Sequence, residues 1–236
     1  SHIHDENAWN GILSILRQGT THQVSIQKSI ELTKLIVNGE HYEIPANIPA
    51  VVHTLLNIHS EETPSLLMKI HDSVVSRLKK EIPNSTKDSN SENSASEKLL
   101  WHVDDQLFEY WLYIMEGLER LCRSIDSGVR FNSFSFLQRI SLSPEILQFP
   151  SHYLVDLFQK VHIVLMDDLF SSVSSQRIAN LREVWQETLI RATNLLIKTY
   201  LHLLPAFTEE NMIEGVWIET LERLIQAMST NAPPLL

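Results

Sequence analysis

Apolar positions recur along this chain at three- and four-residue steps, the period of an α-helix with one buried face. The pattern is clearest between Leu100 and Arg139, where two amphipathic segments follow one another. Between them, Asp126, Ser127 and Gly128 have turn chemistry, because glycine takes positive φ without steric cost. We therefore predict two consecutive helices here, joined by a tight turn in which Gly128 is able to take positive φ.

The same period extends over most of the sequence and predicts further helices. They fall at residues 8–17, 24–37, 51–58, 66–78, 152–170, 178–203 and 212–228. Pro64 fits the first turn of its helix, since proline lacks the N–H group that a helix interior needs. Helix pairs of roughly 40 residues recur in pattern without a strict sequence repeat. The fold class that we predict is all-α, a HEAT/armadillo-like helical solenoid of antiparallel helix pairs.

Local signals predict where the last helices begin and end. The serines between Ser171 and Ser175 are expected to end the helix before them, and Thr208-Glu209-Glu210 is expected to introduce the last helix. We expect that helix to bury one apolar face. Its members are Met212, Ile213, Val216, Leu221, Leu224, Ile225 and Met228.

One stretch interrupts the pattern. Residues 83–97 contain no large apolar side chain, and such a segment cannot offset the entropy lost in ordering it. We interpret residues 83–97 as a disordered polar linker or loop. It would separate N-terminal helical repeats at 1–82 from C-terminal helical repeats at 98–236.

Composition narrows the classes of function. A net charge of -10 argues against nucleic acid as a partner, since neutralising phosphates takes clustered Lys and Arg. The single cysteine, Cys122, falls on an apolar helix face and suits a reducing compartment. No stretch approaches the roughly 18 uninterrupted apolar residues of a membrane-spanning helix, and the first residues lack the profile of a secretion signal. A cytoplasmic location follows as an expectation.

Candidate chemistry is sparse. The 11 histidines include no His-x-x-x-His pair with a third ligand nearby, and His102 with Asp104 and Asp105 comes closest to a metal set. Glycine-rich phosphate loops and nucleophile-base signatures are missing as well. We therefore predict no catalytic residue, no cofactor, no metal and no small-molecule substrate.

The five tryptophans offer a different kind of site, because tryptophan is enriched where proteins bind one another. Trp111 and Trp185 lie on apolar faces and are predicted to be core residues. Trp101 and Trp217 are better surface candidates. The predicted interaction surface consists of Trp101, Trp217, Glu214 and Glu219.

Two stretches resemble the C-terminal region of the large Golgi-type Arf guanine-nucleotide exchange factors, the family of the fungal Gea proteins, plant GNOM and the animal Golgi brefeldin A-resistance factor. The first is the helix pair of residues 100–139. The second is LLIKTYL at 195–201 with VWIETL at 216–221. The chain departs from the family where KTYL replaces the common KVFL, and where it stops soon after Met228 although the family continues into another helix.

The resemblance implies a homology-downstream region, C-terminal to the exchange domain that carries the catalytic glutamate finger. Such a region would be non-catalytic and would serve membrane recruitment, protein interaction or autoregulation in Golgi vesicle traffic. Its implied partners are Arf or Rab-type GTPases or other regions of the same factor, with the Golgi membrane surface as a further candidate, so that it would be cytoplasmic and peripheral to Golgi membranes. The alternative is a HEAT-type scaffold or adaptor module unrelated to Arf exchange factors.

Overall fold

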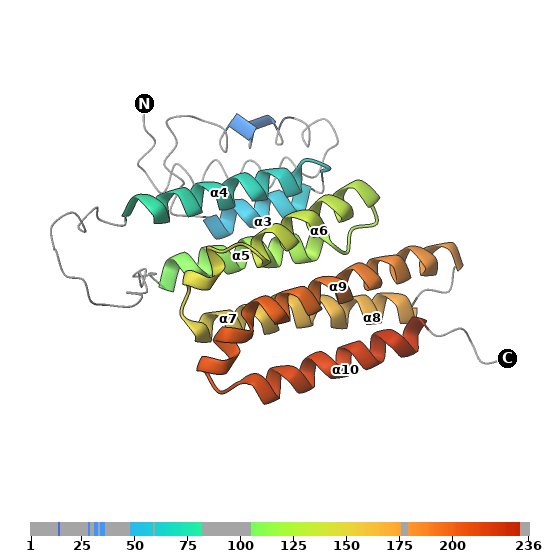
Figure 1. Cartoon of the computed structure of the whole chain (residues 1–236). Helices are drawn as coiled ribbons and strands as arrows, with labels where there is room; N and C mark the ends of the chain where they lie inside the picture. The colour runs from blue at the N-terminus through green and yellow to red at the C-terminus, as the bar shows by residue number, and fades with distance from the viewer. Residues whose placement is uncertain are drawn as a thin grey trace, which may run out of the picture. The chain divides into compact units, whose positions relative to one another are not determined.

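The computed structural model describes residues 48–58, 60–81, 105–175 and 179–231, together with isolated helical positions between 14 and 35. The chain forms two compact units, residues 1–117 and 118–236. All regular structure in the described ranges is helical, with no strand among them (Figure 1). The predicted all-α class, a solenoid of antiparallel helices, is confirmed.

The first unit contains α3 (Ile48–Ile58), α4 (Thr63–Glu81) and most of α5 (Asp105–Leu121). Helices α3 and α4 pack against each other. Pro64 is the second residue of α4, as predicted, where the missing N–H group leaves no hydrogen bond unmade. Among the described residues of this unit, the core is mostly aliphatic, with Phe108, Trp111 and His71 as its buried rings. Its largest members are Leu55, Leu66, Leu67, Met68, Phe108, Trp111, Ile114 and Met115.

Helix α5 approaches its neighbours closely in this unit. Trp111 is completely buried, and the His71 ring of α4 meets its indole edge-on with 4.5 Å between ring centroids. A methyl group added at Gly117 would lie 3.2 Å from Val52 Cγ1 and 3.4 Å from Leu67 Cδ1. The absence of a side chain at Gly117 therefore lets α5 pack against α3 and α4.

The border between the units falls within α5, between Gly117 and Leu118. Residues 83–97, where the sequence predicts a polar linker, lie outside the described residues, as do most of 8–17 and 24–37. The division into 1–82, 83–97 and 98–236 stays a prediction.

The second unit continues with α6 (Ser127–Ser141), a 3₁₀ turn (Ile146–Gln148) and α7 (Ser151–Leu157). A π-helical stretch, η2 (Phe158–Ile163), joins α7 to α8 (Val164–Ser175). Helix α9 (Ala179–Glu209) packs against α6, α7 and α8, and α10 (Ile213–Asn231) then runs antiparallel along α9 (Figure 1). The core of this unit forms where these helices meet. Its members include Leu137, Ile140, Ile146, Leu157, Phe158, Val161, Leu169, Leu189, Leu203 and Phe207.

The turn before α6 differs from the prediction. Asp126 is the N-cap, and its carboxylate accepts a hydrogen bond from the Val129 N–H group at 2.9 Å. Gly128 lies inside the first turn of α6, and no glycine of the described residues has positive φ. Gly128 therefore does not use the left-handed conformation that was open to it, because it is the second residue of α6 and Asp126 caps the helix before it.

The serines expected to end the helix before α9 are themselves helical. Helix α8 runs through to Ser175. The Ser171 hydroxyl donates to the Asp167 carbonyl at 3.0 Å, and the Ser172 hydroxyl donates to the Asp168 carbonyl at 2.9 Å. A serine that bonds back one turn is compatible with a helix. The predicted break at Ser171 was therefore wrong.

The last helix also begins at a different place from the predicted one, at Ile213. Thr208 is still part of α9, where its hydroxyl donates to the Leu204 carbonyl at 2.9 Å. The chain turns at Asn211, whose φ of 55° is left-handed, a conformation that asparagine adopts more readily than most residues. Thr208 and Glu209 thus end one helix and do not begin the next.

Candidate interaction surface

Helix α10 packs against α9, α8 and η2 through small side chains. Val216, Thr220 and Ala227 are buried, and the Thr220 hydroxyl donates to the Val216 carbonyl at 2.7 Å. Small residues one turn apart let the α10 backbone come close to the helices beneath it. The larger apolar side chains of α10 consequently lie on its other sides.

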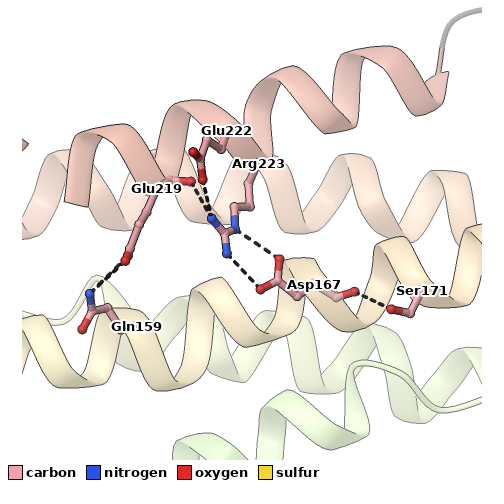
Figure 2. A network of polar contacts seen from close by, with 6 residues as sticks. All are labelled: Gln159, Asp167, Ser171, Glu219, Glu222 and Arg223. Atoms are coloured by element: carbon pink, nitrogen blue, oxygen red, sulfur yellow. Dashed lines mark hydrogen bonds and ion pairs between the residues drawn. The ribbon is translucent and has the colours of Figure 1, made fainter. Parts of the chain in front are cut away.

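An ion pair fastens the same helix to α8. The Arg223 guanidinium donates from Nε to Asp167 Oδ1 at 3.1 Å and from Nη2 to Asp167 Oδ2 at 3.0 Å (Figure 2). Its Nη1 donates to Glu222 at 3.1 Å. The hydrogen bonding of Arg223 to the Asp167 carboxylate is the main cause that raises the pKa of Arg223 above its usual value. Two-point pairing of this kind fixes direction as well as distance.

Glu219, a predicted surface residue, belongs to this anchoring network. Its carboxylate accepts from Gln159 Nε2 of η2, with N–O distances of 3.2 and 3.3 Å (Figure 2). Glu219 is only partly exposed. Its visible role is to hold α10 against η2, whereas Glu214 is exposed.

Trp217 lies on the outer side of α10 and is 43% exposed. Its indole rests on the Tyr200 ring of α9, with 5.4 Å between centroids. Ile225 and Met228 are 64% and 74% exposed, and Met212 and Ile213 are exposed as well. The predicted burial of these four residues was wrong, because the face of α10 that packs is the one carrying Val216, Thr220 and Ala227.

A matching apolar line lies on α9. Ile190, Ile197 and Leu201 are all exposed. They follow one another at seven- and four-residue spacings, and so share one side of the helix. This line was not singled out in the sequence, although its spacing could have revealed a second stripe beside the buried one.

The two lines adjoin. The Tyr200–Trp217 contact fixes the antiparallel register, which brings Leu201 level with Trp217 and Ile190 level with Met228. Around each helix axis, the buried face is followed by the side that carries the Tyr200–Trp217 contact, and then by the exposed apolar line. Because the helices are antiparallel, the two exposed lines lie on the same side of the helix pair, away from the core. The outer seam, as we name it, consists of Ile190, Ile197 and Leu201 of α9 with Trp217, Leu221, Ile225 and Met228 of α10.

The remaining predicted positions divide between core and undescribed chain. Trp111 and Trp185 are buried, as predicted. Trp101 lies outside the described residues. Of the four predicted surface residues, the structure therefore places Trp217 and Glu214 together on the outer side of α10, with Glu219 turned towards η2.

Two buried ionisable side chains lie apart from the outer seam. His162 is completely buried, with Nε2 3.1 Å from the Ser141 hydroxyl, and burial lowers its pKa to about 3. Burial likewise raises the pKa of Glu119 to about 7, although Arg123 beside it acts in the opposite direction. Across the residues that the structure describes, no three His, Cys, Asp or Glu side chains are grouped to hold a metal ion.

The amino-acid sequence matches the model of a known protein family. Residues 111–235 match the family model described as the GBF1-like, tetratrico peptide repeat region. The chain belongs to this GBF1-like family. Tetratrico peptide, HEAT and armadillo repeats are all stacks of antiparallel helix pairs, so the match agrees with the predicted architecture.

Two proteins of Arabidopsis thaliana resemble nearly the whole chain. The ARF guanine-nucleotide exchange factor GNL1 of Arabidopsis thaliana is 24% identical over 98% of this chain, which is 16% of GNL1. The ARF guanine-nucleotide exchange factor GNOM of the same plant is 22% identical over 97% of the chain, again 16% of that protein. The chain thus spans about a sixth of the length of these relatives. No solved structure matches it.

These matches make the chain a region of Arf-exchange-factor type, as the resemblance of residues 100–139 and 195–221 implied. They disfavour the alternative of an adaptor unrelated to such factors. Of the helices that the structure describes, none is both long and apolar enough to cross a bilayer.

Proposed function

We propose that this chain is a non-catalytic regulatory region of an Arf guanine-nucleotide exchange factor, serving protein interaction, membrane recruitment or autoregulation in Golgi vesicle traffic. The observation that carries the proposal is the family match over residues 111–235, joined to relatives named as Arf exchange factors over almost the entire chain.

The surface of the second unit supports an interaction role. Its most distinctive feature is the outer seam, a line of exposed apolar side chains with Trp217 at one end. Stacked helices commonly bind partners along such extended ridges, without needing a deep pocket. An Arf or Rab-type GTPase, or another part of the same factor, is the class of partner that this role calls for.

Two measurements test the proposal. The isolated chain should not accelerate the release of a fluorescent GDP analogue from an Arf GTPase, whereas the intact exchange factor should. Deleting the region that corresponds to residues 111–231 from the intact factor should change its Golgi localisation or its exchange rate on membranes. Exchange activity in the isolated chain, or a deletion that alters neither property, would contradict the proposal.

A further inference from the structure

The geometry points to a specific ligand for the outer seam: we propose that it binds an amphipathic helix of a partner protein, one whose apolar face is flanked by lysine or arginine side chains. This inference rests on the proposed interaction role and gives it a site and a ligand class.

The apolar character of the seam is the first reason. Ile190 and Leu201 of α9 and Ile225 and Met228 of α10 are each at least half exposed. Soluble proteins seldom leave a continuous apolar line in water unless something covers it. Two antiparallel helices form a shallow groove along their contact, and a third helix fits such a groove with side chains at i, i+3, i+4 and i+7.

Trp217 provides an anchor within that groove. Its indole is held from one side by Tyr200, so that little conformational entropy remains to be lost when a ligand covers the other side. A large aromatic side chain that is already fixed and half exposed is typical of a residue that dominates binding energy.

The charged residues near the outer seam indicate which kind of partner helix would bind. Exposed carboxylates stand near the end of the seam that carries Trp217: Glu214 on α10 and Glu210 in the turn before it, whereas Glu222 is paired with Arg223. The Arg and Lys side chains that the structure describes on these two helices are placed otherwise. Arg223 is bonded to Asp167 and Glu222, Arg191 pairs with Glu187, and Lys198 lies on the edge of α9 that faces away from α10. A ligand with basic flanks would therefore meet complementary charge.

The same carboxylates disfavour two other occupants. An anionic membrane surface would be repelled by Glu210 and Glu214 rather than attracted. A second copy of this chain would bring like charges together across the twofold axis of a symmetric dimer. A helix of opposite charge avoids both costs.

Peptide titration against the full 236-residue chain tests the proposal. The probe is a dye-labelled 18-residue synthetic helix, of about five turns, with leucine on one face and lysine on the other, and the matched peptide has glutamate in place of lysine. Fluorescence anisotropy should show the lysine peptide binding at least tenfold more tightly, with an advantage that shrinks as salt is raised. Equal affinities would overturn the charge argument.

Seam variants decide whether the peptide binds where we propose. Met228→Ser should weaken binding about tenfold, and Trp217→Ser should weaken it further. Ile125→Ser is the matched control, because Ile125 is a similarly exposed apolar residue outside the seam. Equal affinity of Met228→Ser and wild type for the peptide would overturn the assignment. Since Met228 is largely exposed, this variant should fold normally, which circular dichroism checks.

The remaining outcomes identify other occupants. Co-sedimentation with phosphatidylcholine vesicles, with or without phosphatidylserine, that Met228→Ser abolishes and the peptide does not inhibit would assign the seam to a membrane. A dimer that Met228→Ser dissociates in sedimentation equilibrium would assign it to a second copy. Failure of the intact exchange factor to bind the peptide would assign it to an internal helix. Each of these results overturns the ligand and leaves the deletion test of the proposed function unaffected.

Discussion

Helices α5 and α10 carry the same signal in the sequence, an apolar stripe with a tryptophan in it, yet they end in opposite environments. Trp111 of α5 is completely buried, whereas Trp217 of α10 is 43% exposed. Helical periodicity therefore reports that a stripe exists and does not report whether the fold covers it. Coverage depends on which neighbours the chain supplies on that side.

The two helices also differ in the size of what they bury. Helix α5 buries Phe108, Trp111 and Met115, although its Tyr113 is 44% exposed. Helix α10 buries Val216, Thr220 and Ala227 and leaves Trp217 and Met228 outside. A helix that packs through its small residues and exposes its large ones has apolar surface left for a second contact. That inversion is the physical basis for treating α10 as an interaction helix.

Truncating the two tryptophans should separate the helices most clearly. Trp111→Ala removes a buried aromatic ring and leaves a cavity, and we expect it to lower the free energy of unfolding by about 3–5 kcal/mol. Trp217→Ala should cost below about 1 kcal/mol, because part of its surface is already in water. Urea titrations measure both values. Similar losses at the two positions would remove the distinction between α5 and α10.

Titration of a buried side chain should give the next largest effect. Burial lowers the pKa of His162 to about 3 from its ordinary 6.5, so that between these pH values the unfolded chain takes up a proton that the folded chain refuses. Stability should therefore fall as the pH falls from about 6.5 towards 3, by up to roughly 3–5 kcal/mol in total.

Comparison with His162→Gln isolates this contribution, since glutamine cannot titrate. The variant should lose less stability on acidification, measured by urea unfolding at several pH values. Glu119 works in the opposite direction, because its raised pKa of about 7 lets stability fall as the pH rises from 4.5 to 7, but it is present in both proteins. His152→Gln, at an exposed position, is the control. Parallel acid curves for wild type and His162→Gln would contradict the prediction.

The surroundings of one glycine in each helix give a third contrast between α5 and α10. A side chain at Gly117 of α5 would press on Val52 and Leu67, whereas one at Gly215 of α10 would meet nothing within 4 Å. We expect Gly117→Leu to destabilise by about 1–3 kcal/mol through overpacking. Gly215→Leu should be neutral or stabilise by up to about 1 kcal/mol, because leucine favours a helix more than glycine does. Thermal unfolding compares them, and a stable Gly117→Leu would show that α5 has room to spare.

The sequence predicts helices well and predicts their ends and surroundings less well. Pro64 was correctly placed because its chemistry restricts the backbone whatever surrounds it. Ser171 and Thr208 were misread because a hydroxyl can either cap a helix or bond back one turn within it, and the neighbouring helices decide. Their positions are set by tertiary contacts, which periodicity does not contain.

The same limit applies to the candidate surface. Trp217 could be named from the sequence because it stands at the edge of an apolar stripe, and Glu214 because it is close to Trp217 in the sequence. The α9 half of the seam could not be paired with them, since the register follows from the Tyr200–Trp217 contact between two helices. The role of Glu219 depends in the same way on Gln159, which is 60 residues earlier in the chain.

The smallest expected effect concerns what holds α10 in place. Asp167→Asn should cost only about 0.5–1 kcal/mol, because Asp167 is about half exposed and water screens its pairing with Arg223. Lys160→Met, which breaks the exposed pair with Asp156, is the matched control and should cost about 0.3 kcal/mol. Urea unfolding with several repeats resolves the two. A loss above about 3 kcal/mol for Asp167→Asn would mean that charge, rather than the packing of Val216, Thr220 and Ala227, keeps α10 on the unit. In that case the inverted burial of α10 would be a consequence of the ion pair, and the exposed stripe could not be taken as a surface shaped for a second contact.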